Sequence, residues 1–208
     1  MSLRRLTISA LGFLLLVLAP APQATAAGTD PASVVTDFGN RALKMLNDPG
    51  ISETERQKRF RMLLDEDFDF NTVSRFVLGR YWQGASEAER RDFAVVFKDY
   101  VVQSYSRRFN EFTDTTFKVT GQRAENETNT IVRTDVTRRG GTGAPAKVDW
   151  RVAKEGANFK IIEVTIDGIS MSLTHRQEFA AIMERNGGRV SDLITTLRTK
   201  VQSSAATQ

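Results

Sequence analysis

The sequence predicts an α+β fold in which helices come first and last and cover a curved, four-stranded antiparallel sheet. Apolar residues recur at helical spacing over 34–112, alternate over 117–166, and return to helical spacing over 179–201. The links at 140–145 and 155–158 hold turn residues and are too short for crossover helices. Strands grouped between helices are typical of a sheet covered on one face.

The first part of the chain predicts four helices. The first covers 34–46 and ends where Asp48-Pro49-Gly50 breaks the pattern. The second begins at Ser52 and the fourth at Ser86, because each serine is followed three residues later by a glutamate, as in a capping box. A short third helix passes through Val73 and ends at Gly79. The fourth helix is expected to run to residue 112 with an aromatic face.

The second part of the chain predicts strands and then two more helices. The alternating segments are 117–119, 130–136, 148–152 and 162–166. Beyond Asp167-Gly168, Thr174 and Gln177 form a second capping pattern, which predicts a fifth helix ending at Gly187-Gly188. A sixth amphipathic helix covers 190–201.

The first 26 residues resemble a secretory leader. Arg4 and Arg5 precede an apolar run, and Ala24-Thr25-Ala26 supplies small residues for cleavage near Ala26. The run is too short to cross a bilayer easily, since a spanning helix needs about 20 apolar residues. We therefore expect a periplasmic protein with a signal peptide (1–26), a single domain (27–202) and a disordered tail (203–208).

Composition narrows the classes of partner. The chain has no cysteine, so packing without disulfides must stabilise it after export. The formal net charge of +4 falls when Arg4 and Arg5 leave with the leader, and no polyanionic partner is required. Arg107-Arg108 and Arg138-Arg139 fit solvated positions, anionic lipid headgroups or acidic partners equally well. We expect no nucleic-acid ligand and a monomer.

Catalytic and metal-binding patterns are missing from the sequence. His175 is the only histidine, and its place just after Thr174 predicts a solvated residue in the first turn of a helix. Asp65, Asp67 and Asp69 alternate like the start of a calcium loop, but phenylalanine occupies the sixth and twelfth positions of that pattern. This segment is expected to be a solvated acidic turn. We expect no catalytic residue, no cofactor and no metal.

The apolar residues allow two interpretations. One strand face opposes the aromatic face of the fourth helix, and the two could enclose an apolar cavity between sheet and helices or pack together as a closed core. Periodicity alone favours the closed core. The strand face consists of Val132, Val136, Trp150, Val152, Ile162, Val164 and Ile166. The helix face includes Phe93, Phe97, Tyr100, Val101 and Tyr105.

Several segments resemble the MlaC family, whose members are also described as toluene-tolerance or organic-solvent-tolerance auxiliary proteins. The resemblance covers about residues 30 to 200, and its most specific parts are Leu78-Gly79-Arg80-Tyr81 and Gly168-Ile169-Ser170-Met171. It also includes Trp82 and the segment from Pro145 to Val152.

The resemblance implies a periplasmic phospholipid-binding protein that carries lipid between membranes. Its implied partners are an inner-membrane ABC transporter complex with an MCE-domain subunit and an outer-membrane lipoprotein complex. It implies a cystatin-like or nuclear-transport-factor-like cone with buried acyl chains. Residues that the shared segments suggest for the cavity wall are Leu78, Tyr81, Trp82, Trp150, Val152, Val164 and Met171.

Three alternatives remain at this stage. The cargo could be a hopanoid or another lipid, since a sister group of the family is associated with hopanoid synthesis. A small isomerase or hydratase on a cone-shaped fold would need acids and histidines inside the cone, where the assigned residues are apolar. An adaptor with a filled core would bind no lipid at all.

Overall fold

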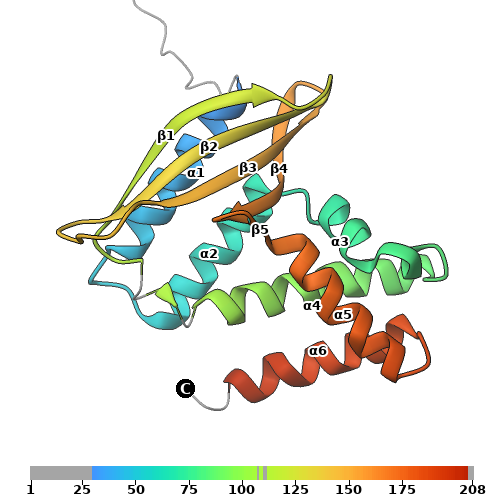
Figure 1. The fold of residues 1–208 in the computed structure, drawn as a ribbon. Coiled ribbons are helices and arrows are strands. Elements are labelled where there is room, and N and C mark those ends of the chain that lie inside the picture. The colour runs from blue at the N-terminus through green and yellow to red at the C-terminus, as the bar shows by residue number, and fades with distance from the viewer. Residues whose placement is uncertain (1–29, 107, 110–111, 206–208) are drawn as a thin grey trace, which may run out of the picture.

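The computed structural model describes residues 30–106, 108–109 and 112–205, and it shows one curved sheet with helices packed against it (Figure 1). The first elements are α1 (Pro31–Leu46), α2 (Glu53–Asp67), α3 (Phe70–Leu78), the 3-10 helix η1 (Gly79–Trp82) and α4 (Glu87–Ser106). The strands are β1 (Thr115–Ala124), β2 (Asn129–Arg138), β3 (Ala146–Glu155), β4 (Asn158–Ile166) and β5 (Ile169–Ser170). The last elements are α5 (Met171–Arg185) and α6 (Val190–Ala205). This order confirms the predicted α+β class, with helices first and last.

The strands form a single antiparallel meander in the order β1-β2-β3-β4-β5. Val132 pairs with Trp150, which pairs with Val164, so one row of apolar side chains crosses three strands. Register shifts in the β1–β2 and β3–β4 pairs mark β-bulges, which increase the local twist of a sheet. The fifth strand was not predicted, because two residues are too few to show an alternating pattern.

Two of the three predicted helix caps are present in the structure. Ser86 Oγ accepts from the Glu89 amide, and the Glu89 carboxylate accepts from the Ser86 amide at 2.8 Å, which completes a capping box before α4. Ser52 caps α2 by accepting from the Glu55 amide. The predicted cap at Thr174 is wrong, because Ser170 Oγ caps α5 by accepting from the Leu173 amide at 3.0 Å.

The fourth helix ends six residues earlier than predicted. Its last residue is Ser106, and the amides of Arg108 and Phe112 instead donate to carbonyls three residues earlier in the chain. These turns bury Phe109 against the sheet and bring the chain toward β1. The apolar spacing beyond Ser106 therefore reflects packing of a turn on the core and not a continuing helix.

The acidic segment that includes the end of α2 is more ordered than predicted. Asp67 is buried, and both of its carboxylate oxygens accept from Arg41 of α1 at 2.6 Å. Burial raises the pKa of Asp67, and the Arg41 guanidinium offsets part of that effect. Asp69 caps α3 by accepting from two backbone amides. The expectation of a solvated turn is therefore wrong at Asp67, which joins α1 to α2.

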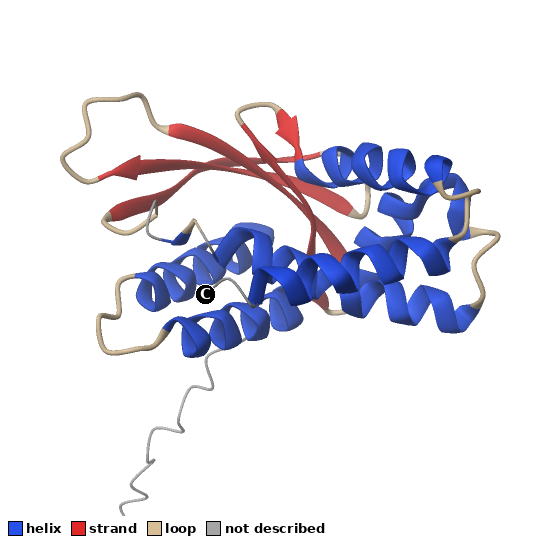
Figure 2. Ribbon diagram, turned by 90° about the horizontal axis from the view of Figure 1, so that it is seen from below, coloured by secondary structure: helices blue, strands red, loops and turns tan. Residues whose placement is uncertain are grey.

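The core consists of two groups of buried residues. We call the group on α3 to α6 the helical cluster; its members include Val77, Leu78, Phe93, Phe97, Phe179, Met183, Leu193 and Leu197. We call the group between α1, α2 and the inner face of the sheet the sheet cluster; its members include Val35, Phe38, Met45, Val132, Trp150, Val152 and Ile161. Figure 2 shows the helices and the curved strands that carry these two groups.

Two chain ends are relevant to the predicted domain boundaries. The predicted leader at 1–26 lies outside the described residues. Helix α6 continues to Ala205, so the helix extends into the segment that was expected to be a tail. Within the described ranges, no helix is both long enough and apolar enough to span a bilayer.

Candidate functional site: an apolar cavity between the two clusters

A cavity of about 270 Å³ lies where the helical cluster meets the sheet cluster. Val73 and Phe97 line it from the helical cluster, whereas Phe38, Phe109 and Trp150 line it from the sheet cluster. The surface of its wall is almost wholly apolar. Such a space suits the hydrocarbon part of a ligand, because transfer of apolar surface out of water is its main driving force.

Strands β3 and β4 form one wall of the cavity, through Trp150, Ile162, Val164 and Ile166. The indole N–H of Trp150 donates to Thr134 Oγ1 at 2.9 Å inside the sheet. The only polar atom of the tryptophan side chain is therefore satisfied away from the cavity, and its ring presents an apolar surface. Arg151 pairs with Glu163 and Val152 with Ile161, so Ile162 is the extra residue of a bulge.

The opposite wall comes from helices α1 to α4. Phe97, Val101 and Tyr105 lie one turn apart on α4 and line the cavity in a row. Helices α1 and α2 contribute Phe38, Ala42, Met45, Leu46, Phe60 and Leu64. Phe68 follows α2, and Phe70, the first residue of α3, contacts Phe97 edge to face with ring centroids 5.9 Å apart. Aromatic rings thus make up much of the helical side.

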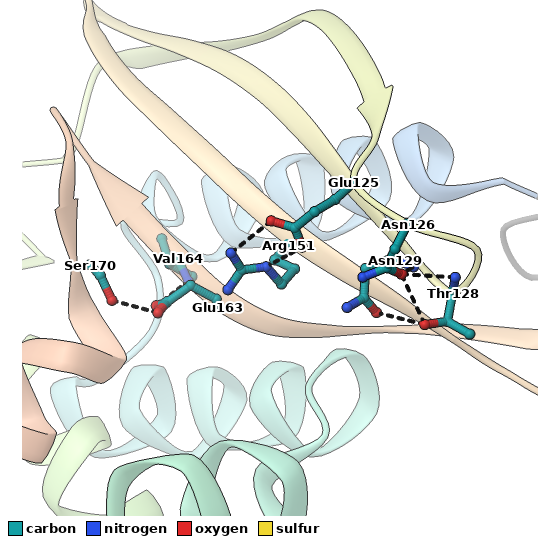
Figure 3. Close-up of polar contacts among 8 residues, drawn as sticks. All are labelled: Glu125, Asn126, Thr128, Asn129, Arg151, Glu163, Val164 and Ser170. Carbon is teal, nitrogen blue, oxygen red and sulfur yellow. Dashed lines mark hydrogen bonds and ion pairs between the residues drawn. The ribbon is translucent and has the colours of Figure 1, made fainter.

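A buried carboxylate fixes the start of α5 beside the cavity (Figure 3). Glu163 Oε1 accepts from the amides of Val164 and Ser172, at 2.8 and 3.1 Å, and its Oε2 accepts from Ser170 Oγ at 2.5 Å. A negative charge at a helix N-terminus is also favoured by the helix dipole. Glu163 therefore holds the first turn of α5 in place, so that Met171 and Ser172 lie on the cavity wall.

The outer face of β3 carries charges that are kept away from the cavity. Arg151 donates to both carboxylate oxygens of Glu125, at 2.7 and 2.9 Å, across the sheet (Figure 3). Asn126 Oδ1 accepts from the amides of Thr128 and Asn129 and closes the turn between β1 and β2. Because side chains alternate along a strand, Trp150 and Val152 face inward while Arg151 faces outward.

His175 does not lie where the sequence placed it. Because α5 begins at Met171, His175 falls in the second turn and lines the cavity, with its side chain only 13 % exposed. Its ring stacks on Phe179 and meets Phe97 and Tyr100 edge to face. Burial lowers the pKa of His175, and the carboxylate of Glu178 offsets part of this effect. The prediction of a solvated histidine is therefore wrong.

The structure divides the sixteen predicted wall residues into two groups. Those that line the cavity are Phe97, Val101, Tyr105, Trp150, Ile162, Val164, Ile166 and Met171. Those that do not line it are Leu78, Tyr81, Trp82, Phe93, Tyr100, Val132, Val136 and Val152.

The residues away from the cavity are separated from it by packing. Leu78 and Phe93 are almost fully buried in the helical cluster, and Tyr81, Trp82 and Tyr100 pack against that cluster. Val132 and Val152 are fully buried in the sheet cluster, with Val136 packed beside them. These eight residues belong to the two clusters or pack against them, and they do not line the cavity.

Helices α1 and α2 supply six of the wall residues that the sequence analysis missed. The others are Phe68, Phe70, Val73, Phe109, Phe112, Glu163, Ser172 and His175. The helical spacing of Phe38, Ala42 and Met45 did identify an apolar face on the first helix. Nothing in that spacing indicates which distant segment the face packs against. These residues were missed because their place on the cavity wall depends on contacts between segments that are far apart in the chain. No local sequence pattern records such contacts.

Within the described part of the chain, no group of three or more histidine, cysteine or acidic residues is placed to hold a metal ion. The cavity contains one carboxylate and one imidazole, and the carboxylate of Glu163 is already used by three hydrogen bonds. The arrangement is therefore suited to enclosing an apolar molecule.

Comparisons with known proteins agree with this geometry. A curated relative, the toluene tolerance protein ttg2D of Pseudomonas putida, is 25% identical over 186 residues, covering 87% of this chain and 86% of that protein. The fold is similar to that of a solved phospholipid-binding protein from Ralstonia solanacearum in complex with a phospholipid. The TM-score is 0.73 at 23% identity, with 85% of this chain and 99% of that chain covered. The sequence model of the MlaC protein matches residues 37–199, and the chain therefore belongs to the MlaC family.

Proposed function

We propose that this protein is a periplasmic phospholipid carrier that moves lipid between the inner and outer membranes with its acyl chains in the cavity. The observation that carries the proposal is the almost wholly apolar cavity between sheet and helices. The family assignment confirms the prediction that the chain is not an enzyme. The bound phospholipid of the Ralstonia solanacearum protein, which has the same fold, supports the choice of ligand.

The physical need for a carrier follows from the cost of exposing acyl chains to water. Each buried methylene is worth about 0.8 kcal/mol, so a two-chain lipid leaves a membrane only when another apolar environment receives its chains. The cavity supplies that environment. Its volume of about 270 Å³ lies just below the range of roughly 300–1,000 Å³ of typical ligand pockets. We therefore expect the helical wall to move outward when two chains enter.

The proposal includes a location and two partners. Residues 1–26 would direct export and be removed near Ala26, which leaves one domain over 27–202. The donor and acceptor would be an inner-membrane ABC transporter complex with an MCE-domain subunit and an outer-membrane lipoprotein complex. The carrier would act as a monomer that visits each in turn.

The central test is what the protein carries when bacteria produce it with its leader sequence, so that it is exported before it is purified. Native mass spectra should show a lipid-sized adduct, and organic extraction should yield close to one phospholipid per protein. Recovery of a hopanoid would change the cargo while keeping the carrier. Recovery of no lipid, from protein that is folded by circular dichroism, would contradict the proposal.

A pair of charged substitutions tests whether the lipid occupies this cavity. Val164→Glu places a carboxylate on the sheet wall, where burial of an unpaired charge is costly, and should abolish lipid recovery. Val95→Glu adds the same charge at a valine that is 61% exposed on α4, and should leave lipid recovery unchanged. Equal lipid content in the two variants would place the ligand elsewhere.

A further inference from the structure

The apolar cavity contains a tyrosine hydroxyl that is poorly satisfied. Tyr105 lines the cavity from α4, and its hydroxyl contacts Met171 Sδ of α5 at 3.4 Å. A thioether sulfur is a weak acceptor, so this contact uses little of the donor strength of the hydroxyl. Burial raises the pKa of Tyr105, which keeps the proton on its oxygen at neutral pH. The cavity therefore holds an O–H donor without a strong acceptor.

A second polar group lines the same side of the cavity. Nδ1 of His175 is buried and has no hydrogen-bond partner among the described residues, and Glu178 Oε2 lies 3.7 Å away. The lowered pKa leaves the imidazole neutral near pH 7, with one N–H donor and one acceptor nitrogen. The stacking of the ring on Phe179 and its contact with Phe97 require only an aromatic ring and not its nitrogens.

Buried polar groups in folded proteins are nearly always hydrogen-bonded, and each exception needs an explanation. Here two incompletely satisfied groups lie on neighbouring helices and line one cavity. Met171 contacts the Tyr105 hydroxyl and lies one helical turn before His175 on α5. A polar atom that arrives with the ligand would satisfy both groups, and this is the simplest physical reason for placing them there.

The charges around the cavity restrict what that polar atom can be. No lysine or arginine is among the described residues that line the cavity, so the wall itself offers no opposite charge to a phosphate or a free carboxylate; Arg108 acts on Tyr105 from outside the lining. The carboxylate of Glu163 also lines the cavity and would repel an anion. Glu163 itself is engaged at the start of α5 and is not available to the ligand. An uncharged acceptor oxygen fits these conditions.

We propose that Tyr105 and His175 bind the carbonyl oxygen of an acyl ester, and so fix the depth at which a glycerolipid enters the cavity. The inference rests on the proposed function and names a chemical group that the function alone does not require. The tyrosine O–H donates to one lone pair of the carbonyl, and the imidazole N–H donates to the other. A carbonyl has two lone pairs in its plane, so it accepts both donors at once.

The test compares a diacyl phospholipid with its dialkyl ether analogue, which has the same headgroup and chain lengths but no carbonyl. Binding of each lipid to delipidated full-length protein is measured for the natural sequence, Tyr105→Phe, His175→Phe and Tyr100→Phe. A net hydrogen bond corresponds to about a fivefold change in affinity, so the natural protein should prefer the ester lipid by about fivefold or more. Tyr105→Phe and His175→Phe should each reduce that preference.

Tyr100→Phe is the matched control. It removes a hydroxyl from the same helix, but that hydroxyl donates to Glu178 and Tyr100 does not line the cavity. The ester preference should therefore survive in Tyr100→Phe. Circular dichroism checks that each variant is folded, and the two tyrosine variants keep the ring and lose one oxygen.

Four outcomes would overturn the inference. Equal affinity of the natural protein for ester and ether lipids would show that the carbonyl does not contribute to binding. The proposed carrier function would still stand. An ester preference that persists in the Tyr105→Phe, His175→Phe double variant would assign the contact to other groups. Tighter binding of oleic acid than of the diacyl lipid would assign the site to a free carboxyl group. Binding of none of these lipids would overturn the proposed function together with the inference.

Discussion

The two halves of the core differ in how completely they are filled. In the helical cluster, Phe93, Phe97 and Phe179 pack with ring centroids 5.5 to 6.0 Å apart, and each is at most 2% exposed. In the sheet cluster, Phe60 and Val164 are only partly buried and line an open space. Both halves use the same kinds of residue, so composition does not decide which half can accept a ligand.

The difference arises from the shape of the elements. Helix α4 runs from the closed half to the cavity, since Phe93 is buried among helices whereas Val101 and Tyr105 line the cavity. Helices pack closely on one another when their side chains interdigitate. A curved sheet with bulges keeps part of its inner face away from the helix layer, and side chains alone do not fill the gap. The cavity therefore lies at the point where helix-on-helix packing gives way to helix-on-sheet packing.

Truncation of a phenylalanine in each half should give the largest contrast. Phe179→Ala opens a void in a closed cluster and should lower the free energy of unfolding by about 3–5 kcal/mol. Phe60→Ala removes a ring that already faces the cavity, so fewer contacts are lost and the loss should fall below about 3 kcal/mol. Urea unfolding of delipidated protein measures both values. Equal losses would mean that the two halves are packed alike.

Enlargement of an alanine in each half should change stability in opposite directions. Ala85→Leu adds volume to the closed helical cluster and should cost about 1–3 kcal/mol through overpacking. Ala42→Leu partly fills the cavity and should raise the stability of the lipid-free protein by about 0.5–2 kcal/mol. The same substitution should weaken lipid binding, because the added methyl groups occupy ligand space. Destabilisation by both changes would indicate that the cavity closes in solution.

The sequence predicted the sheet more accurately than the cavity. Alternation of Val148, Trp150 and Val152 identified an inner strand face, and the structure buries all three residues. The pattern could not separate Val152, which does not line the cavity, from Trp150, which does, because both satisfy the same alternation. That distinction depends on how far the sheet curves away from the helices, which is a property of the whole fold.

The predicted start of the fifth helix was wrong, and this error also changed the expected position of His175. Thr174 and Ser170 are four residues apart, and both are acceptable caps, so the sequence alone allowed either start. The choice of Ser170 depends on Glu163 of β4, whose carboxylate accepts from Ser170 Oγ and the Ser172 amide. A start at Met171 moves His175 from the first turn into the cavity wall. The contact with Glu163, which is distant from the cap in the predicted pattern, therefore sets where α5 begins. It also places His175 on the cavity wall as a candidate ligand-binding group.

The smallest expected effect concerns the pH dependence of stability at the boundary between the two halves. Burial lowers the pKa of His175 from its ordinary value of 6.5, so the unfolded chain binds a proton more readily than the folded one. Stability should therefore fall as pH decreases from about 6.5, because protonation favours the unfolded state. The nearby Glu178, which pairs with Lys200 and Tyr100, limits the effect by partly stabilising the imidazolium.

Urea unfolding of delipidated protein between pH 7.5 and about 5 should show a smaller decrease in the free energy of unfolding for His175→Phe than for the natural protein. Parallel curves would mean that the histidine is as well solvated in the folded state as in the unfolded chain, and so does not line a dry cavity.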